Sequence, residues 1–497
     1  MSDHILRAEN IKKSFGGVEA LRGVSLEVGS GEIHCLAGEN GCGKSTLIKI
    51  ISGFYEADEG TIEINGQRFS RLNPPEAIAL GVQVIYQDFS LFPNLTVMEN
   101  LALNMELMDK RWLVNYRRMR GIATEAMGKI GFTVDLEERV ENLSIAEKQL
   151  IAICRALLYD AKIIIMDEPT TALTRKEVRS LFSVIKNLQS QGIAILFVSH
   201  KLDEVFEISE RFTILRNGMN VSTGKTGELD NKKFAYHMTG RNFSEESYTP
   251  ASLSAAPVLD VSGLSLRGNY QDVSFRLYGG EILGITGLLG SGRAELVQTL
   301  FGVSRPDSGA IAVRGRPVKI RRVRDAINLG IGYVPADRLT EGLFLSQSIG
   351  RNMVVSGLAR LSGRAGFLFR DRIHREIESW ISELAIAAND YEREVKTLSG
   401  GNQQKVVLAR WLANDLKLLI LNGPTVGVDI GSKYDIHGLL RNLAARGLGI
   451  IVISDDLPEL MACCNRIIVM REGRIVRELK ASETTEAGLG EIATGTA

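Results

Sequence analysis

The apolar residues of this chain gather in short continuous runs. The clearest are residues 163–166 and 193–198, which no polar residue interrupts, and residues 32–37 form a further apolar stretch. Uninterrupted runs of this length suit strands buried on both faces of a parallel sheet. Residues 45–51, which come after a glycine-rich turn, have the apolar spacing of a helix. The pattern therefore predicts α/β units of strand, turn and helix.

The same succession occurs twice along the chain. Gly38 matches Gly287 at an offset of 249 residues, and Ser144 matches Ser399 at an offset of 255. The second copy has therefore gained a net six residues, between Ala336 and Leu398. Self-similarity with a nearly constant offset indicates two homologous domains.

We place these domains at residues 6–240 and 257–490. The join, residues 244–256, is rich in small and polar residues and contains Pro250, as expected of a short linker. Between residues 95 and 143 the pattern becomes helical and more charged, which predicts an inserted helical subdomain.

Composition argues against several classes of protein. The 59 basic and 59 acidic residues cancel, which gives no support to bulk binding of nucleic acid or anionic lipid. The five cysteines form no Cys-x-x-Cys pair, so a zinc site is not expected, and they fit a reducing compartment. There is neither a signal-peptide core nor an apolar run near the roughly 18 residues that span a bilayer. We expect any work at a membrane to pass through another subunit.

A glycine-rich turn between a predicted strand and a predicted helix carries the first candidate site. Its residues are Gly38, Glu39, Asn40, Gly41, Cys42, Gly43, Lys44, Ser45 and Thr46. The glycines let backbone N–H groups face a phosphate at the start of a helix, whose dipole favours anions. Lys44 has the reach for the β- and γ-phosphates of ATP, and the Ser45 hydroxyl can ligate Mg²⁺. We interpret the turn as an ATP-binding P-loop rather than a chance glycine turn.

Two acidic residues, Asp167 and Glu168, follow the run 163–166. An aspartate at a strand end beside a P-loop can hold Mg²⁺, and the adjacent glutamate can orient or deprotonate the attacking water. The alternative is a pair of helix-capping acids, which are common. The spacing from the P-loop favours the catalytic interpretation.

The second copy has lost most of this chemistry. Its P-loop keeps the glycines, but Arg293 replaces the lysine and Ala294 replaces the hydroxyl residue. The acidic pair is replaced by Asn422 and Gly423, which supply neither a metal carboxylate nor a base for water. The sequence therefore predicts one intact and one degenerate ATP site.

A wider set of residues resembles the ATP-binding cassette (ABC) ATPases. Gln87 resembles their Q-loop glutamine and His200 their switch histidine, while Phe15 resembles the aromatic residue that stacks on adenine. Ser399, Gly400 and Gly401 resemble the signature motif. The resemblance implies, for each half, a RecA-like core, a β-subdomain and an inserted helical subdomain. It also implies that Gln87 contacts Mg²⁺ and assists hydrolysis.

In ABC ATPases two nucleotide-binding domains pair head to tail, so that each ATP lies between one P-loop and the opposite signature. The resemblance therefore implies intrachain pairing of the two halves. The first composite site would have every element, with Ser399 to Gly401 facing Lys44. The second would have Ala336 at the Q-loop position, Asp455 at the histidine position and a signature, residues 143–147, without its glycines. Because Arg293 keeps a positive charge, nucleotide binding by the second site stays open.

Residues 143–149, 287–293 and 332–338 resemble one branch of the family, the tandem ATP-binding subunits of bacterial monosaccharide importers of the ribose/galactose/xylose type. This resemblance implies ATP and Mg²⁺ as cofactors, and a position at the cytoplasmic face of the inner membrane. The implied partners are an integral-membrane permease in two copies and an extracytoplasmic sugar-binding protein. Helices within residues 88–142 and 337–397 would carry the coupling contacts.

The chain departs from that branch at Asn422 and Gly423, where the branch usually keeps Asp-Glu, and also at Ala336 and Asp455. These departures affect only the second site. Two alternatives stay open: an importer of a nucleoside or signalling sugar, and a tandem ABC ATPase that acts on ribosomes. Ribosomal members have two competent sites and a long charged linker, neither of which this sequence shows.

The asymmetry generates a first prediction. We expect Glu168→Gln to lower steady-state ATP turnover by about 100-fold or more, because it removes the base that orients water. Arg293→Ala should retain much of the turnover, since its site lacks the catalytic groups. Phosphate release by the two purified variants checks this, and an equal loss in both would contradict the asymmetric model.

Overall fold

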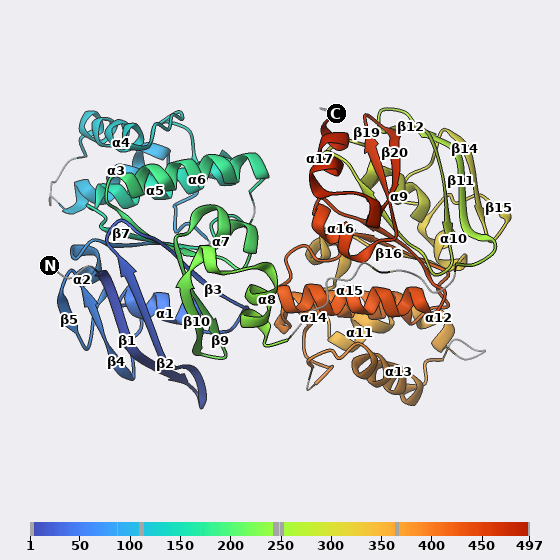
Figure 1. Cartoon of the computed structure of the whole chain (residues 1–497), viewed down its shortest axis with the longest axis horizontal. Coiled ribbons are helices and arrows are strands. Elements are labelled where there is room, and N and C mark those ends of the chain that lie inside the picture. Colours follow the sequence, from blue (N-terminus) through green and yellow to red (C-terminus); the bar gives the residue numbers. More distant parts are fainter. Residues whose placement is uncertain are drawn as a thin grey trace. The chain divides into compact units, whose positions relative to one another are not determined.

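The structure is a computed structural model that describes residues 4–86, 88–108, 114–171, 173–241, 248, 253–362, 367–388 and 390–495. It divides into two compact units, Met1–Phe243 and Ser244–Ala497, here called unit 1 and unit 2 (Figure 1). Each unit is described by itself. Most of the predicted linker, residues 244–256, lies outside the described residues, and the predicted domain limits stay predictions.

The central layer of unit 1 is a six-stranded sheet with the order β10-β9-β3-β8-β7-β6. Its strands are β3 (Ile33–Gly38), β6 (Val82–Ile85), β7 (Ile163–Asp167), β8 (Ala194–Val198), β9 (Arg211–Arg216) and β10 (Met219–Lys225). All neighbouring pairs are parallel except β9 and β10. Strands β3 and β8 are buried along their whole length, as their apolar runs predict. The parallel strands bring their carboxyl ends, and the residues that follow, to one edge of the sheet.

A second, antiparallel sheet forms the β-subdomain of unit 1. Its order is β2-β1-β4-β5, with β1 (His4–Phe15), β2 (Val18–Gly29), β4 (Glu59–Ile64) and β5 (Gln67–Phe69). Buried and exposed residues alternate along parts of β1 and β2, because one face of this sheet packs on the core.

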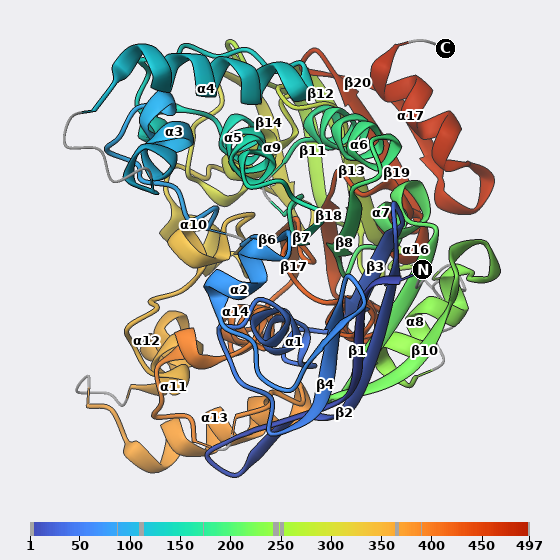
Figure 2. The same cartoon turned by 90° about the vertical axis from the view of Figure 1, so that its left-hand side faces the viewer.

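Helices complete unit 1. They are α1 (Lys44–Ile51), α2 (Pro74–Ala79), α3 (Val97–Met108), α4 (Tyr116–Ile130), α5 (Ile145–Leu158), α6 (Arg175–Ser190), α7 (Leu202–Ile208) and α8 (Asn231–Thr239), with short turns η1 (Val140–Asn142) and η2 (Thr226–Glu228). Helices α3, α4 and α5 pack on one another and lie together in both views of the unit (Figures 1 and 2). They form the helical subdomain that the pattern between residues 95 and 143 predicts.

Unit 2 repeats the arrangement strand for strand. Its large sheet has the order β16-β17-β18-β13-β19-β20 and its small sheet the order β12-β11-β14-β15. The strands are β11 (Pro257–Leu266), β12 (Tyr270–Tyr278), β13 (Ile282–Thr286), β14 (Ser308–Val313), β15 (Arg316–Val318), β16 (Ile331–Val334), β17 (Leu418–Asn422), β18 (Gly449–Ile453), β19 (Arg466–Arg471) and β20 (Arg474–Lys480). The predicted α/β class with two homologous halves is confirmed.

The helices of unit 2 are α9 (Arg293–Phe301), α10 (Val323–Asn328), α11 (Ile349–Val354), α12 (Leu358–Leu361), α13 (Arg370–Glu383), α14 (Gly400–Leu412), α15 (Ile430–Ala445), α16 (Leu457–Cys463) and α17 (Glu486–Thr494). Shorter turns are η3 (Arg338–Gly342), which is a π-helix, η4 (Val355–Gly357), η5 (Val395–Thr397) and η6 (Ala481–Glu483). Among the described residues, no helix combines the length and apolar character needed to cross a bilayer.

The π-helix η3 accounts for part of the length difference between the two copies. In unit 1 the Phe92 N–H donates to Asn100 Oδ1, and in unit 2 the Phe344 N–H donates to Asn352 Oδ1. These equivalent contacts have an offset of 252 residues, midway between the offsets before and after the gain. Half of the six additional residues therefore lie ahead of Phe344, where η3 forms.

The close approach of α14 to α15 generates a stability prediction. A Cβ added at Gly401 would overlap the Ser432 side chain at the start of α15, whereas a Cβ at Gly438, within α15, would meet nothing within 4 Å. We expect Gly401→Ala to lower the free energy of unfolding by about 1–3 kcal/mol, as overpacking does. Gly438→Ala should instead raise it by about 0.4–1 kcal/mol, because it restricts the unfolded chain. Urea unfolding of the two variants decides, and an unchanged midpoint for Gly401→Ala would refute the packing argument.

Candidate ATP site

The P-loop connects the end of β3 to the start of α1. Gly43 has a φ of 108°, and a Cβ at this position would lie 2.8 Å from the Ala20 carbonyl oxygen, so glycine is required. The Lys44 side chain is buried, and its Nζ donates to the Gly38 carbonyl at 2.5 Å and to the Glu39 carbonyl at 3.0 Å. The predicted P-loop residues thus form one continuous turn with the ammonium group folded back over it.

Asp167, at the end of β7, lies against the P-loop. The Ser45 hydroxyl hydrogen-bonds to it, and Lys44 is close enough to act on it electrostatically. Burial and the neighbouring charge of Glu168 nevertheless raise the pKa of Asp167. The negative charge of Asp167 is therefore only partly neutralised by the protein. A hydroxyl and a carboxylate of this kind are ligands that Mg²⁺ prefers, so the donor set fits that ion.

Glu168 and His200, which follow β7 and β8, are in contact with each other at the same edge of the sheet as Asp167. The His200 Nδ1 lies 3.2 Å from Glu168 Oε1, and both side chains are largely buried. This hydrogen bond lowers the pKa of Glu168. Glu168 also has a φ of 48°, which is held by the hydrogen bond from its N–H to the Val198 carbonyl at 3.1 Å. The contact with His200 therefore favours the ionised form of Glu168 and fixes the position of its carboxylate. A general base needs both of these properties.

A buried carboxylate that the sequence analysis did not single out joins the two strand ends. Glu204, in α7, accepts hydrogen bonds from Thr170 Oγ1 at 2.5 Å and from Ser199 Oγ at 2.6 Å. Thr170 follows β7 and Ser199 follows β8, so Glu204 fixes Asp167 and Glu168 relative to His200. The signal that could have revealed it is Glu459, which stands 255 residues later, at the repeat offset.

Phe15, at the end of β1, presents a partly exposed ring. Its relative exposure is 41%, Tyr55 packs edge-on against it with ring centroids 5.2 Å apart, and Lys13 Nζ lies 5.5 Å from its centroid. The free ring face can stack on a planar base.

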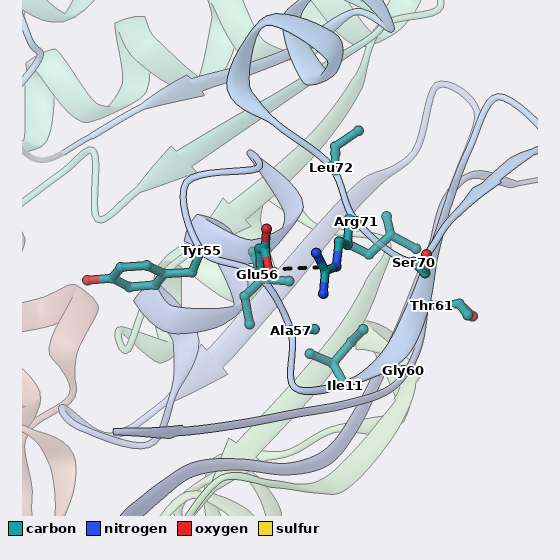
Figure 3. Close-up of a pocket in the computed structure, with 11 residues that line it drawn as sticks. Ile11, Tyr55, Glu56, Ala57, Gly60, Thr61, Ser70, Arg71 and Leu72 are labelled. Carbon is teal, nitrogen blue, oxygen red and sulfur yellow. Dashed lines mark ion pairs between the residues drawn. The ribbon is translucent and has the colours of Figure 1, made fainter. Parts of the chain in front are cut away.

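A small pocket lined in part by Tyr55 is a separate feature. Glu56 and Arg71 form an ion pair at 3.8 Å across it (Figure 3). Its cavity volume is about 10 Å³, room for about one water molecule. The pocket is therefore too small to be the nucleotide site.

In unit 2 the matching positions make different contacts. Arg293 pairs with Asp455 and also donates to the Ser454 carbonyl at 3.4 Å. The Asn422 side chain hydrogen-bonds to Tyr333. Gly423 keeps the left-handed conformation of Glu168, with a φ of 60°, but has no side chain. Ala294, the second residue of α9, has no hydroxyl where unit 1 has Ser45.

The two signature positions also differ. Ser399 precedes α14, and its hydroxyl accepts a hydrogen bond from Asn402 Nδ2 at 2.9 Å. In unit 1, Ser144 forms a capping box with Glu147, in which its hydroxyl donates to Glu147 Oε2 at 2.7 Å. The first-half signature thus carries a carboxylate where the second-half signature carries a neutral amide.

Two Q-loop positions complete the site set. Gln87 lies outside the described residues. Ala336, its counterpart in unit 2, is exposed after β16. The role of Gln87 stays a prediction.

Comparison with known proteins identifies the family. A model described as ABC transporter matches the chain twice, over residues 21–171 and 270–426, which together exceed half of its length. The chain belongs to the ABC transporter family. One match falls in each unit, so this ABC protein is a tandem of two cassettes.

Several relatives align over nearly the whole chain. Ribose import ATP-binding protein RbsA of Bacillus subtilis is 39% identical over 490 residues, and the alignment covers 99% of both chains. RbsA 3 of Rubrobacter xylanophilus is 42% identical over 491 residues, with 99% and 98% covered. A putative ribose/galactose/methyl galactoside import ATP-binding protein of Burkholderia cenocepacia is 41% identical over 492 residues, with 99% and 96% covered.

Among solved structures, the chain is similar to an ATP-binding cassette of an ABC transporter in its ADP conformation. The identity is 30%, the match covers 46% of this chain and 94% of that one, and the TM-score is 0.43.

The environment of Asp167 generates a prediction with opposite effects on stability and activity. Because the folded pKa is raised, the stability linked to protonated Asp167 is present below the ordinary value of 3.8 and is lost as the pH rises through the folded value. At neutral pH we expect Asp167→Asn to raise the thermal midpoint of the nucleotide-free protein by about 2–4 °C. ATP hydrolysis should be lost.

The control is Asp160→Asn, which changes a carboxylate whose side chain is 86% exposed and should leave both quantities unchanged. The difference between Asp167→Asn and the parent should shrink as the pH is lowered toward 4. A lower midpoint for Asp167→Asn at neutral pH would contradict the account.

Proposed function

We propose that this protein is the ATP-hydrolysing subunit that energises import of a monosaccharide through a membrane ABC permease. The observation that supports this most strongly is the full-length likeness to sugar-import ATP-binding proteins. The contacts of unit 1 support it independently, since Lys44, Asp167, Glu168 and His200 converge at one edge of its sheet.

In this proposal ATP binds to the P-loop of unit 1. Lys44 leaves its loop carbonyls to contact the β- and γ-phosphates, and the α1 N-terminus faces the anion. Phe15 stacks on the adenine through its exposed face. Ser45, Asp167 and Gln87 hold Mg²⁺, which neutralises phosphate charge when it is bound.

Glu168 then orients the water that attacks the γ-phosphate. Its carboxylate accepts a hydrogen bond from that water, and His200 fixes the carboxylate and donates to a phosphate oxygen. Because the pKa of Glu168 is lowered, the group is ionised at neutral pH. Glu168 can accept this hydrogen bond only at a pH above its lowered pKa, where the carboxylate is ionised.

We further propose that the two units pair within the chain, so that Ser399, Gly400 and Gly401 close on the γ-phosphate held by unit 1. The signature helix α14 begins at Gly400, and its free N–H groups and dipole suit an anion. Glu147 disfavours the same role for the signature of unit 1, because a carboxylate beside a triphosphate is repelled.

The proposed partners are an integral-membrane permease in two copies and an extracytoplasmic sugar-binding protein. The chain would lie at the cytoplasmic face of the inner membrane, with its helical subdomains toward the permease. An importer of a nucleoside or signalling sugar is the main alternative, because the solute does not touch this subunit. Action on ribosomes is the less favoured alternative.

Purification of the tagged protein from gently solubilised membranes of its native host tests the proposal. We expect a multi-span permease to accompany it, and ATP hydrolysis by the reconstituted complex to rise severalfold with a binding protein loaded with ribose or galactose. The matched control is the Glu168→Gln complex, which should assemble but show no stimulation. Ribosomal proteins in place of a permease would overturn the importer assignment.

A further inference from the structure

The P-loop of unit 2 holds its own cation in an ion pair. In unit 1 the Lys44 ammonium group donates to atoms of its own loop, namely the Gly38 and Glu39 carbonyl oxygens and the Cys42 sulfur. In unit 2 the Arg293 guanidinium turns instead to the residues after β18, where it pairs with Asp455 and contacts the Ser454 carbonyl. The Arg293 side chain is only 10% exposed in this arrangement.

Both partners stand at positions that are assigned to phosphate in unit 1. Arg293 occupies the position of Lys44, and Asp455 that of His200. A histidine can donate a hydrogen bond to a phosphate oxygen, but an ionised aspartate can only accept one. Asp455 therefore neutralises the cation of this P-loop and adds a negative charge next to the place where a γ-phosphate would lie.

The position that corresponds to the proposed metal ligand Asp167 is also engaged by a contact within unit 2. Asn422, at the position of Asp167, hydrogen-bonds to Tyr333, which also contacts the Gln298 side chain. Unit 1 has Val84 and Lys49 at the positions of Tyr333 and Gln298. The Asn422 side chain thus has a hydrogen-bond partner, Tyr333, that exists only in unit 2, and Ala294 offers no hydroxyl.

From these contacts we infer that the P-loop of unit 2 does not take ATP, because the Arg293–Asp455 ion pair fills the role that a bound phosphate has in unit 1. Lost ligand contacts are replaced by contacts within the protein, so the unit is stable without nucleotide. The chain then binds one ATP, at the P-loop of unit 1. This goes beyond the proposed function, which concerns hydrolysis at unit 1 and holds whether or not unit 2 binds nucleotide.

The test uses the full-length protein with Lys44→Ala, which silences the first P-loop, and equilibrium dialysis against Mg²⁺-ATP. We expect no ATP bound to Lys44→Ala at about 1 mM nucleotide, a ceiling chosen near the upper range of cellular substrate affinities. Adding Asp455→Ser releases Arg293 and removes the repelling charge, and should restore about one bound ATP per chain. Asp455→Asn is the second variant, should the serine variant fail to fold.

The matched control is Asp456→Ser in the same background. Asp456 is the adjacent carboxylate and forms an ion pair with Lys433 at 2.5 Å. It also caps the N-terminus of α16, and a serine at this position can cap the helix as well. It should gain no ATP binding. A gain for Asp456→Ser equal to that for Asp455→Ser would overturn the inference, because loss of any local charge would then suffice.

Three further outcomes are decisive. ATP bound to Lys44→Ala and lost on adding Arg293→Ala would show that unit 2 binds nucleotide, and would overturn the inference. ATP bound to Lys44→Ala at one per chain and unaffected by Arg293→Ala would support the inference and count against the assignment of Lys44 in the proposed function. No gain with either Asp455 variant, both folded by thermal unfolding, would overturn the role of the ion pair.

Discussion

The junction between β7 and β8 depends on one buried carboxylate. Glu204 accepts hydrogen bonds from Thr170 and Ser199, one after each strand. Hydrogen bonds to a charged group contribute about 1.5–3 kcal/mol, and losing Glu204 would leave the Thr170 and Ser199 hydroxyl donors without this acceptor. The contact of Glu168 with His200 exists because these two loops are held at a fixed separation. The proposed chemistry of unit 1 therefore rests on a group that takes no part in it.

Unit 2 keeps this junction although Asn422 and Gly423 stand at the positions of Asp167 and Glu168. Glu459 accepts hydrogen bonds from Thr425 Oγ1 at 2.6 Å and from Ser454 Oγ at 2.5 Å, and His437 lies 3.2 Å from the same carboxylate. The fold of a cassette needs its strand-end loops fixed whether or not ATP is hydrolysed. The two units differ in the side chains around this junction. In unit 2 these include Asp455, which forms an ion pair with Arg293.

The signature loops show the same separation of scaffold from chemistry. A serine occupies the N-cap position of the following helix in both units, but only the Ser144 hydroxyl accepts a backbone hydrogen bond there. In unit 1 the cap is completed by Glu147, which strengthens the helix end but places a negative charge there. In unit 2 the neutral Asn402 leaves the start of the helix open to an anion. A single position thus decides whether the helix start carries a capping box with a carboxylate or a neutral amide.

The sequence by itself determined the repeat, several buried strands, the helix after the glycine-rich turn and the helical pattern between residues 95 and 143. Residues 163–166 predict β7 (Ile163–Asp167), and residues 45–51 predict α1 (Lys44–Ile51), because burial on both faces and helical spacing leave local patterns. The tertiary structure alone decided that Arg293 meets Asp455, 162 residues further on, and that Glu204 joins two loops. Such contacts leave no periodic trace, since they depend on how parallel strands bring distant residues to one edge of a sheet.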